Sequence, residues 1–264
     1  MSASRAPNVL NEIWSYRQLL RSLVVRNLKV KYKRSLLGFL WTLLNPLLTV
    51  GVLAVVFTHI VKIPLRHYLA FLFSSYFVWN FMLQTISSGT FLLAEHAQLA
   101  RSVAFPKEVP VIAGVISHLV EFIIELLLIV VGLIVFHHQS MPASFVLLPY
   151  LVLVQYVLAL GLVFPIAGLS VFYLDVQHLL PIVMTVLFYI SPVFYPASMV
   201  PEAMRPYFMG NPIAQLLTVY QAVLYDGAFP SWKILGILTA TAVGLLLAGY
   251  AVFNRHKHDV AEVI

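Results

Sequence analysis

The sequence predicts an all-α protein that crosses a membrane six times, with an amphipathic helix before the first crossing and short re-entrant helices before the last. Three observations predict this class. Of the 264 residues, 61% are hydrophobic and only 10% are charged, whereas soluble domains carry about 25% charged residues. The mean hydropathy is +0.93. Half of the sixteen Lys and Arg residues lie in the first 34 positions, directly before a long apolar run.

Six apolar runs approach the roughly 20 residues that a membrane-spanning helix needs. They cover residues 36–61, 68–93, 110–136, 146–172, 177–195 and 233–253. With the N-terminus inside, the inner segments carry 12 of the 16 Lys and Arg residues, and the outer segments carry the other four. Because Lys and Arg are retained in the cytoplasm, both termini are expected there. No cleavable signal peptide is expected, since the first apolar run begins late and is too long.

Residues 1–34 are predicted to form an amphipathic helix on the cytoplasmic membrane surface. Apolar residues recur at spacings of three and four, with basic residues between them, as in a helix whose apolar face lies on lipid. The alternative is a helix that packs on a protein partner, and the two are compatible. The residues expected to define this helix are Trp14, Arg17, Leu20, Arg21 and Val24.

The segment 191–225 combines broken backbone with an apolar composition. Five prolines lie between Ser191 and Pro212, yet the residues around them are mostly apolar. Proline ends or kinks helices, and irregular backbone at membrane depth is tolerated only inside protein or beside a water-filled cavity. We expect re-entrant helices on the outer side here, the alternative being an ordinary proline-rich loop.

Several function classes are excluded or weakened by what the sequence lacks. No glycine is followed by lysine, so there is no phosphate-binding loop of the G-x-x-x-x-G-K-[ST] type. Without cysteine there are no thiolate metal sites. The paired histidines at 137–138 and 256/258 are expected to be solvated, so no metal is expected. The basic charge flanks the spans, which favours contact with anionic membrane lipid over nucleic acid.

Four blocks carry a resemblance, in order and in spacing. They are Lys31–Trp41 (KYKRSLLGFLW) with Asn45-Pro46, Leu99–Pro106 (LARSVAFP), Asp175–Gln177 (DVQ), and Ser191–Pro196 (SPVFYP) with Val200-Pro201 and Asn211-Pro212. Together they resemble the ABC-2 type exporter permeases for cell-surface glycopolymers, which comprise the O-antigen, capsular polysaccharide and wall teichoic acid permeases.

This resemblance implies a homodimer of six-span permeases (residues 35–264 here) joined to two copies of a separate ABC ATPase in a bacterial inner or plasma membrane. The permease would hold no cofactor and perform no catalysis, because ATP and Mg²⁺ bind to the partner. The substrate implied is a lipid-linked polysaccharide or wall teichoic acid, moved from the cytoplasmic to the outer face. The inner loop 94–109 would dock into the ATPase, with coupling residues at Glu95, Gln98, Arg101, Phe105, Pro106 and Lys107.

A pore for a glycopolymer needs groups that match sugar rings without holding them tightly. Aromatic faces pack against apolar ring faces, and they need no buried charge. We expect the aromatic residues near span one and the re-entrant region to line the channel. These candidates are Trp41, Phe57, Phe188, Tyr189 and Phe194.

His118, Glu121 and Glu125 share one face of span three, at positions i, i+3 and i+7. A charge at the bilayer centre costs on the order of 3 kcal/mol on insertion scales, so these groups are expected to face protein or water. A polar channel lining or a dimer contact is one interpretation. An intramolecular contact without a role in transport is the other, and the sequence leaves both open.

Three other function classes compete with the exporter. An ABC-2 permease for small-molecule or drug efflux would share this fold. A membrane-embedded transferase would need clustered carboxylates or basic residues at the interface, which the short inner loops lack. Ion-coupled transport would need partnered intramembrane carboxylates and often inverted repeats. A pair of small residues in span six, Gly244 and Ala248, is a weak indication of close helix packing.

Overall fold

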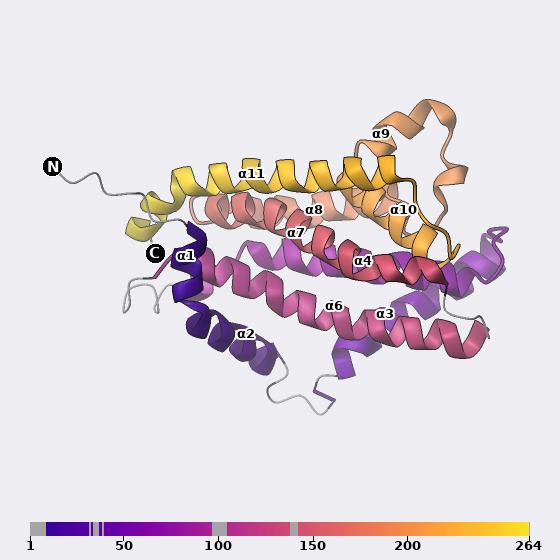
Figure 1. Ribbon diagram of the computed structural model, residues 1–264, viewed down its shortest axis with the longest axis horizontal. Helices are drawn as coiled ribbons and strands as arrows, with labels where there is room; N and C mark the ends of the chain where they lie inside the picture. The colour runs from indigo at the N-terminus through magenta and orange to yellow at the C-terminus, as the bar shows by residue number, and fades with distance from the viewer. Residues whose placement is uncertain are drawn as a thin grey trace.

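The computed structural model describes residues 9–31, 33, 37–38, 40–96, 105–137 and 142–263. Those residues form a bundle of long, roughly parallel and antiparallel helices with short helices at both ends (Figure 1). In chain order the elements are α1 (Val9–Ser15), α2 (Arg17–Lys31), α3 (Leu40–Val55), η1 (Val56–Ile60), α4 (Tyr68–Gly89), η2 (Ala94–His96), α6 (Glu108–His137), η3 (Ala143–Leu147), α7 (Leu148–Ser170), α8 (Asp175–Ile190), η4 (Ala197–Met199), η5 (Glu202–Met204), α9 (Arg205–Met209), α10 (Pro212–Leu224) and α11 (Trp232–Val263).

Five helical segments of the described chain are long and apolar enough to cross a membrane. They are Leu40–Ile60, Tyr68–Gly89, Glu108–Ile134, Ala143–Ser170 and Trp232–Lys257, and they match five of the six predicted spans. The predicted fifth span, 177–195, is the 16-residue helix α8. At 1.5 Å per residue it is about 24 Å long, less than the roughly 30 Å hydrocarbon core. The number of crossings is therefore five by length and composition, and the sixth stays a prediction.

The N-terminal segment forms two helices, α1 and α2, with a turn at Tyr16 between them. α1 and the C-terminal part of α11 lie at the same end of the bundle, and α9 lies at the opposite end (Figure 1). We refer to these as the α1 end and the α9 end of the bundle.

The core lies along α4, α7 and α10. α4 contributes most of its residues to it, and the side chains of Trp79, Phe71 and Tyr220 are almost completely buried. α3 and α8 are much less covered, with only 17% of the hydrophobic window of α3 buried and only Met184 of α8 buried. Two apolar helices thus present broad faces that the single chain leaves uncovered.

α7 and α11 pack backbone to backbone. A Cβ atom built on Gly161 would lie 2.6 Å from the backbone nitrogen of Leu246, and one built on Gly249 would overlap the carbonyl oxygen of Gly161. Small residues permit such an approach between helices. The close helix packing that the sequence indicated at Gly244 is not found there, because a Cβ atom built on Gly244 meets nothing of the described chain within 4 Å.

Segment 191–225 consists of short helical turns followed by α10. Asn211 caps α10, its side chain accepting a hydrogen bond from the backbone of Ile213 at 3.0 Å. Ten residues of α10 are buried, so this helix is inserted into the bundle and packs on α4 and α11. The α10 helix is therefore not an exposed loop, whereas residues 201–207 of the proline-rich part are exposed, and the re-entrant arrangement stays a prediction.

Candidate functional site

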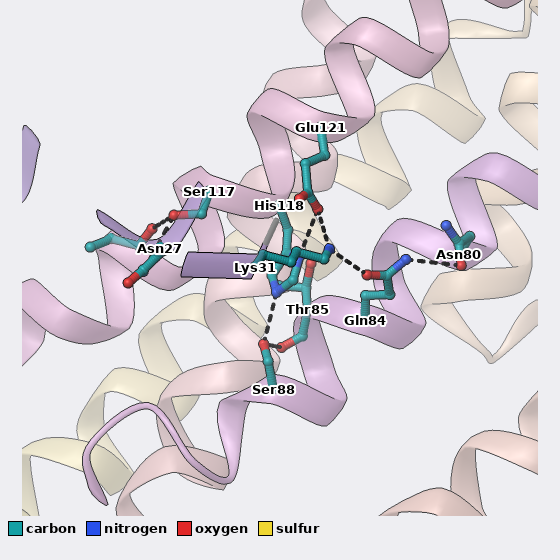
Figure 2. Close-up of polar contacts among 10 residues, drawn as sticks. Asn27, Lys31, Asn80, Gln84, Thr85, Ser88, Ser117, His118 and Glu121 are labelled. Atoms are coloured by element: carbon teal, nitrogen blue, oxygen red, sulfur yellow. Dashed lines mark hydrogen bonds and ion pairs between the residues drawn. The ribbon is translucent and has the colours of Figure 1, made fainter. Parts of the chain in front are cut away.

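Lys31, the last residue of α2, ties that helix to α6 through an ion pair. Its ammonium group donates to a carboxylate oxygen of Glu121 at 2.8 Å and to the side-chain oxygen of Gln84 on α4 at 3.1 Å (Figure 2). The Glu121 side chain is only 6% exposed, and that of Lys31 is 37% exposed. A long amphipathic side chain can thus carry its charge from the surface helix to a buried carboxylate.

Further hydrogen bonds surround this pair. His118 Nδ1 lies 3.3 Å from the same oxygen of Glu121, and its Nε2 lies 3.1 Å from the hydroxyl of Ser88 on α4 (Figure 2). One turn earlier on α2, the side-chain amide of Asn27 donates to the hydroxyl of Ser117 at 3.4 Å. Two groups of polar side chains therefore join α2 to α6, and the larger one also includes residues of α4.

The three polar residues on one face of α6 have different surroundings. His118 and Glu121 point toward α2 and α4, where they make intramolecular contacts. Glu125, one turn further along, is 3% exposed and instead lines a cavity beside α3 and α4. The structure thus shows an intramolecular contact for His118 and Glu121, and a role of these residues in a channel stays a prediction.

The apolar side of α2 packs on protein. Leu23 is buried against Phe105, Val109 and Ala113 at the start of α6, and Leu20 and Val24 pack against the same cluster. Among the residues predicted to define the amphipathic helix, Leu20 and Val24 therefore pack against the start of α6 in the same chain.

Trp14 lies apart from this packing. It belongs to α1 and is 70% exposed, with the guanidinium of Arg17 5.8 Å from its ring centre. Arg17 and Arg21 are exposed. Trp14 therefore remains available for an outside surface such as lipid, while Leu20 and Val24 are half-buried against the chain's own helix.

The inner loop between α4 and α6 is described only at its two ends. Gln98 and Arg101 lie outside the described residues. Glu95 is exposed on η2, and Pro106 and Lys107 are half-buried at the start of α6. Phe105 is buried against the apolar side of α2, and its role in coupling to an ATPase stays a prediction.

A second polar contact joins α2 to this loop. Arg26 Nη2 donates to His96 Nε2 at 2.7 Å, and His96 Nδ1 lies 2.8 Å from the carbonyl oxygen of Leu92. Since arginine only donates, His96 must accept at Nε2 and donate at Nδ1, which is the neutral form. Burial and the nearby Arg26 charge lower the pKa of His96, in agreement with that assignment.

The start of α6 is also held by the C-terminal helix. Lys257 and the hydroxyl of Tyr250, both on α11, each donate to the buried carboxylate of Glu108 at 3.1 Å. The end of the inner loop is thus fixed to α11 on one side and to α2 on the other.

Most of the predicted channel aromatics meet at the α9 end of the bundle. Phe57 of η1 stacks on Phe194 with ring centres 4.9 Å apart, and Phe188 and Tyr189 lie 5.5 Å and 6.0 Å from Phe194. We call these four residues the outer aromatic cluster. Tyr189 is 62% exposed, so the cluster has an open side. Among the described residues, Trp41 makes no ring contact with the cluster and is 42% exposed near the start of α3.

Hydrogen bonds to backbone carbonyls fix the chain beside this cluster. The hydroxyls of Tyr68 and Ser75 on α4 donate to the carbonyl oxygens of Phe194 and Val193, each at 2.6 Å. Gln221 on α10 donates to that of Pro192, also at 2.6 Å. The proline-rich segment therefore has its backbone acceptors satisfied by side chains, as burial requires.

Sequence reasoning missed Lys31, Arg26 and His96 as contact residues. Lys31 was counted among the charges that set topology, and nothing near it in the sequence indicates a partner, because Glu121 lies ninety positions away. His96 gave no signal, because a single histidine beside a loop has no distinguishing pattern.

With this geometry described, the sequence can be compared with known proteins. The model of a family described as ABC-2 type transporter matches residues 18–225, which is more than half of the chain. The chain belongs to the ABC-2 transporter family. The family match begins in α2 and ends just beyond α10, so it includes the Lys31–Glu121 pair, the inner loop and the outer aromatic cluster.

Individual members of the ABC-2 family are similar over nearly their whole length. The O-antigen export system permease protein RfbA of Myxococcus xanthus is 33% identical over 97% of this chain and 99% of its own. A Klebsiella pneumoniae protein of the same name is 25% identical over 90% and 92%. The capsule polysaccharide export inner-membrane protein CtrC of Neisseria meningitidis is 22% identical over 95% and 96%. This ABC-2 protein is a multi-pass integral membrane protein of the polysaccharide exporter permease family.

Proposed function

We propose that this protein is the membrane-spanning permease subunit of an ATP-driven exporter, which moves a lipid-linked cell-surface polysaccharide from the cytoplasmic to the outer face of the membrane. The observation that carries the proposal is the full-length similarity to permeases named for O-antigen and capsule export. Wall teichoic acid is the alternative polymer of the same class. The chain provides the path and a separate ABC ATPase provides the energy.

The outer aromatic cluster supports a sugar polymer as the cargo. Aromatic faces bind sugar rings through apolar contact without a charged group. The cluster is partly exposed at Tyr189 and lies where α8 ends. A polymer that left the membrane along α8 would pass these rings.

The uncovered faces of α3 and α8 support a homodimer. Both helices expose large apolar side chains, such as Leu48 and Val52 on α3 and Ile182 and Val186 on α8. In the proposed dimer a second copy faces these helices across the polymer path, and α8 forms the sixth crossing. The chain has no cysteine, so single cysteines at Leu48 and Val186 can report the pairing by crosslinking in native membranes. Crosslinking absent at both positions would contradict this dimer.

The function is tested in the source bacterium by deleting the gene for this chain. The polysaccharide should disappear from the surface of intact cells, and its lipid-linked form should accumulate inside. Inactivating the partner ATPase should give the same result, whereas dissipating the proton gradient in cells supplied with ATP should not. Surface polysaccharide that persists in the deletion strain would refute the proposal, and unchanged polysaccharide with lost drug resistance would favour small-molecule efflux.

A further inference from the structure

A cavity of about 580 Å³ lies between α3, α4 and α6. Its volume is within the range of small-molecule binding sites, about 300–1,000 Å³. The wall is mostly apolar and comes from all three helices. It includes Leu43 and Leu47 of α3, Phe73 and Phe77 of α4, and Ile129 and Leu133 of α6, and the imidazole-bearing His67 also lines it.

Glu125 provides a carboxyl group in this apolar wall. It is 3% exposed, and in the part of the chain that the structure describes its side chain makes no hydrogen bond and no ion pair within 4 Å. The contrast with Glu121, one turn earlier, is direct, because Glu121 is paired with Lys31 at 2.8 Å. An uncompensated buried charge is costly, so a buried carboxyl without a partner stays protonated unless a cation pairs with it. The cavity therefore has an acidic group whose counter-charge the described side chains do not supply at contact distance.

We propose that this cavity binds a hydrophobic cation, with its apolar body between α3, α4 and α6 and its positive group at Glu125. Charge complementarity selects a cation over a neutral lipid chain, because a neutral chain would leave the carboxyl unpaired. A sugar would be a poor ligand, since its hydroxyls would meet an almost entirely apolar wall. The inference does not rest on the proposed function.

The location of Glu125 links this site to α2. Glu125 lies about 26 Å along α6 from Glu108, and Glu121 and Glu125 are neighbours on one helical face. A cation bound at Glu125 would thus sit about one helical turn from the Lys31–Glu121 pair. A ligand in the cavity would therefore lie close to the Lys31–Glu121 contact that attaches α2 to α6.

The test uses the full chain in lipid nanodiscs and radiolabelled tetraphenylphosphonium as the probe. Wild-type protein should bind the probe saturably. Glu125→Gln removes the charge at constant shape and should weaken binding about tenfold, the loss expected for a charged contact. Gly132→Leu should also weaken binding, because Gly132 lines the cavity and a Cβ atom there meets nothing within 4 Å. This variant fills the cavity without changing its charge.

Gly236→Leu is the matched control. A Cβ atom at Gly236 also meets nothing within 4 Å, but the residue lies on the exposed face of α11 and away from the cavity. It should bind the probe like wild type, and melting temperatures should show that all three variants are folded. Absence of saturable wild-type binding, or equal binding by wild type and the two cavity variants, would overturn the proposal. Equally tight binding of uncharged hexadecanol that is insensitive to Glu125→Gln would do the same, and would assign the cavity to a lipid chain.

Discussion

The ammonium group of Lys31 lies 2.8 Å from Glu121 Oε2, so the end of α2 is tied to the middle of α6. One partner approaches from a surface helix, and the other is a buried carboxylate inside a membrane-length helix. Removing one partner of such a pair destabilises the protein more than replacing both partners by apolar residues. The reason is that the remaining charge is left buried without compensation.

Replacing Lys31 with Met should therefore lower the free energy of unfolding by about 1.5–3 kcal/mol, the range for a hydrogen bond to a charged group. The double variant Lys31→Met with Glu121→Gln should regain part of that loss, because it leaves no unpaired charge. Thermal melting of the purified protein measures both, and the double-mutant cycle isolates the pair. Additive losses in the double variant would show that the two residues are not coupled.

The packing of α2 on α6 predicts unequal effects within the N-terminal segment. Leu20→Gln and Val24→Gln should weaken the packing of α2 on Phe105, Val109 and Ala113. Export should then fall relative to ATP hydrolysis, because motion of the inner loop would no longer be transmitted to α2. Trp14→Gln should leave that packing intact, since Trp14 is 70% exposed. The ratio of polymer exported to ATP hydrolysed, measured in vesicles, checks this. Similar ratios in all three variants and wild type would show that the N-terminal segment affects membrane topology but not the coupling of export to ATP hydrolysis.

The Arg26–His96 contact predicts a dependence on pH. In the unfolded chain histidine titrates near pH 6.5, and burial lowers the pKa of His96 in the folded protein. Above about pH 6.5 both states are neutral and the contact contributes fully. As the pH falls below that value the unfolded state binds the proton first, so stability is lost progressively down through the folded pKa.

His96→Gln should remove this dependence, because a glutamine oxygen can accept from Arg26 at any pH. The melting temperature of wild type should fall more than that of the variant between about pH 8 and about pH 5.5. Parallel falls in the two proteins would rule out His96 as the source.

The α7–α11 contact predicts a sharp difference between two glycines of α11. Gly249→Ala should destabilise the protein by about 1–3 kcal/mol, the usual cost of overpacking, because the new methyl group would overlap the carbonyl oxygen of Gly161. Gly244→Ala should be neutral or slightly stabilising, since its Cβ atom has open space and alanine favours helix. Calorimetry on the two variants decides this, and equal melting temperatures would show that the helices separate without cost.

The long apolar helices could be predicted from the sequence because length and hydropathy determine them directly. α4, α6, α7 and α11 each begin within three residues of the expected position. The predicted fifth span was too long, because it continued through Ser191-Pro192, where the helix ends. Proline at 192 and again at 196 prevents the helix from continuing, and apolar composition alone does not register that break.

The polar contacts could be predicted only in part. Spacing placed His118, Glu121 and Glu125 on one face correctly, but it could not show that the partner of Glu121 is Lys31, ninety positions away. Similarly, Gly249 and Gly161 are distant in sequence, so neither glycine could be recognised as a contact from its own helix. Pairings between distant residues depend on the packing of whole helices, which local patterns do not contain.

The interlocked backbones of Gly161 and Gly249 have a mechanical consequence. Two helices whose backbones touch cannot slide past each other without first separating, and separation would expose the buried side chains of both. We therefore expect α7 and α11 to move as one unit, which Lys257 and Tyr250 join to α6 through Glu108. If the protein widens, we expect α3 and α8 to move instead, because the rest of the described chain covers them least.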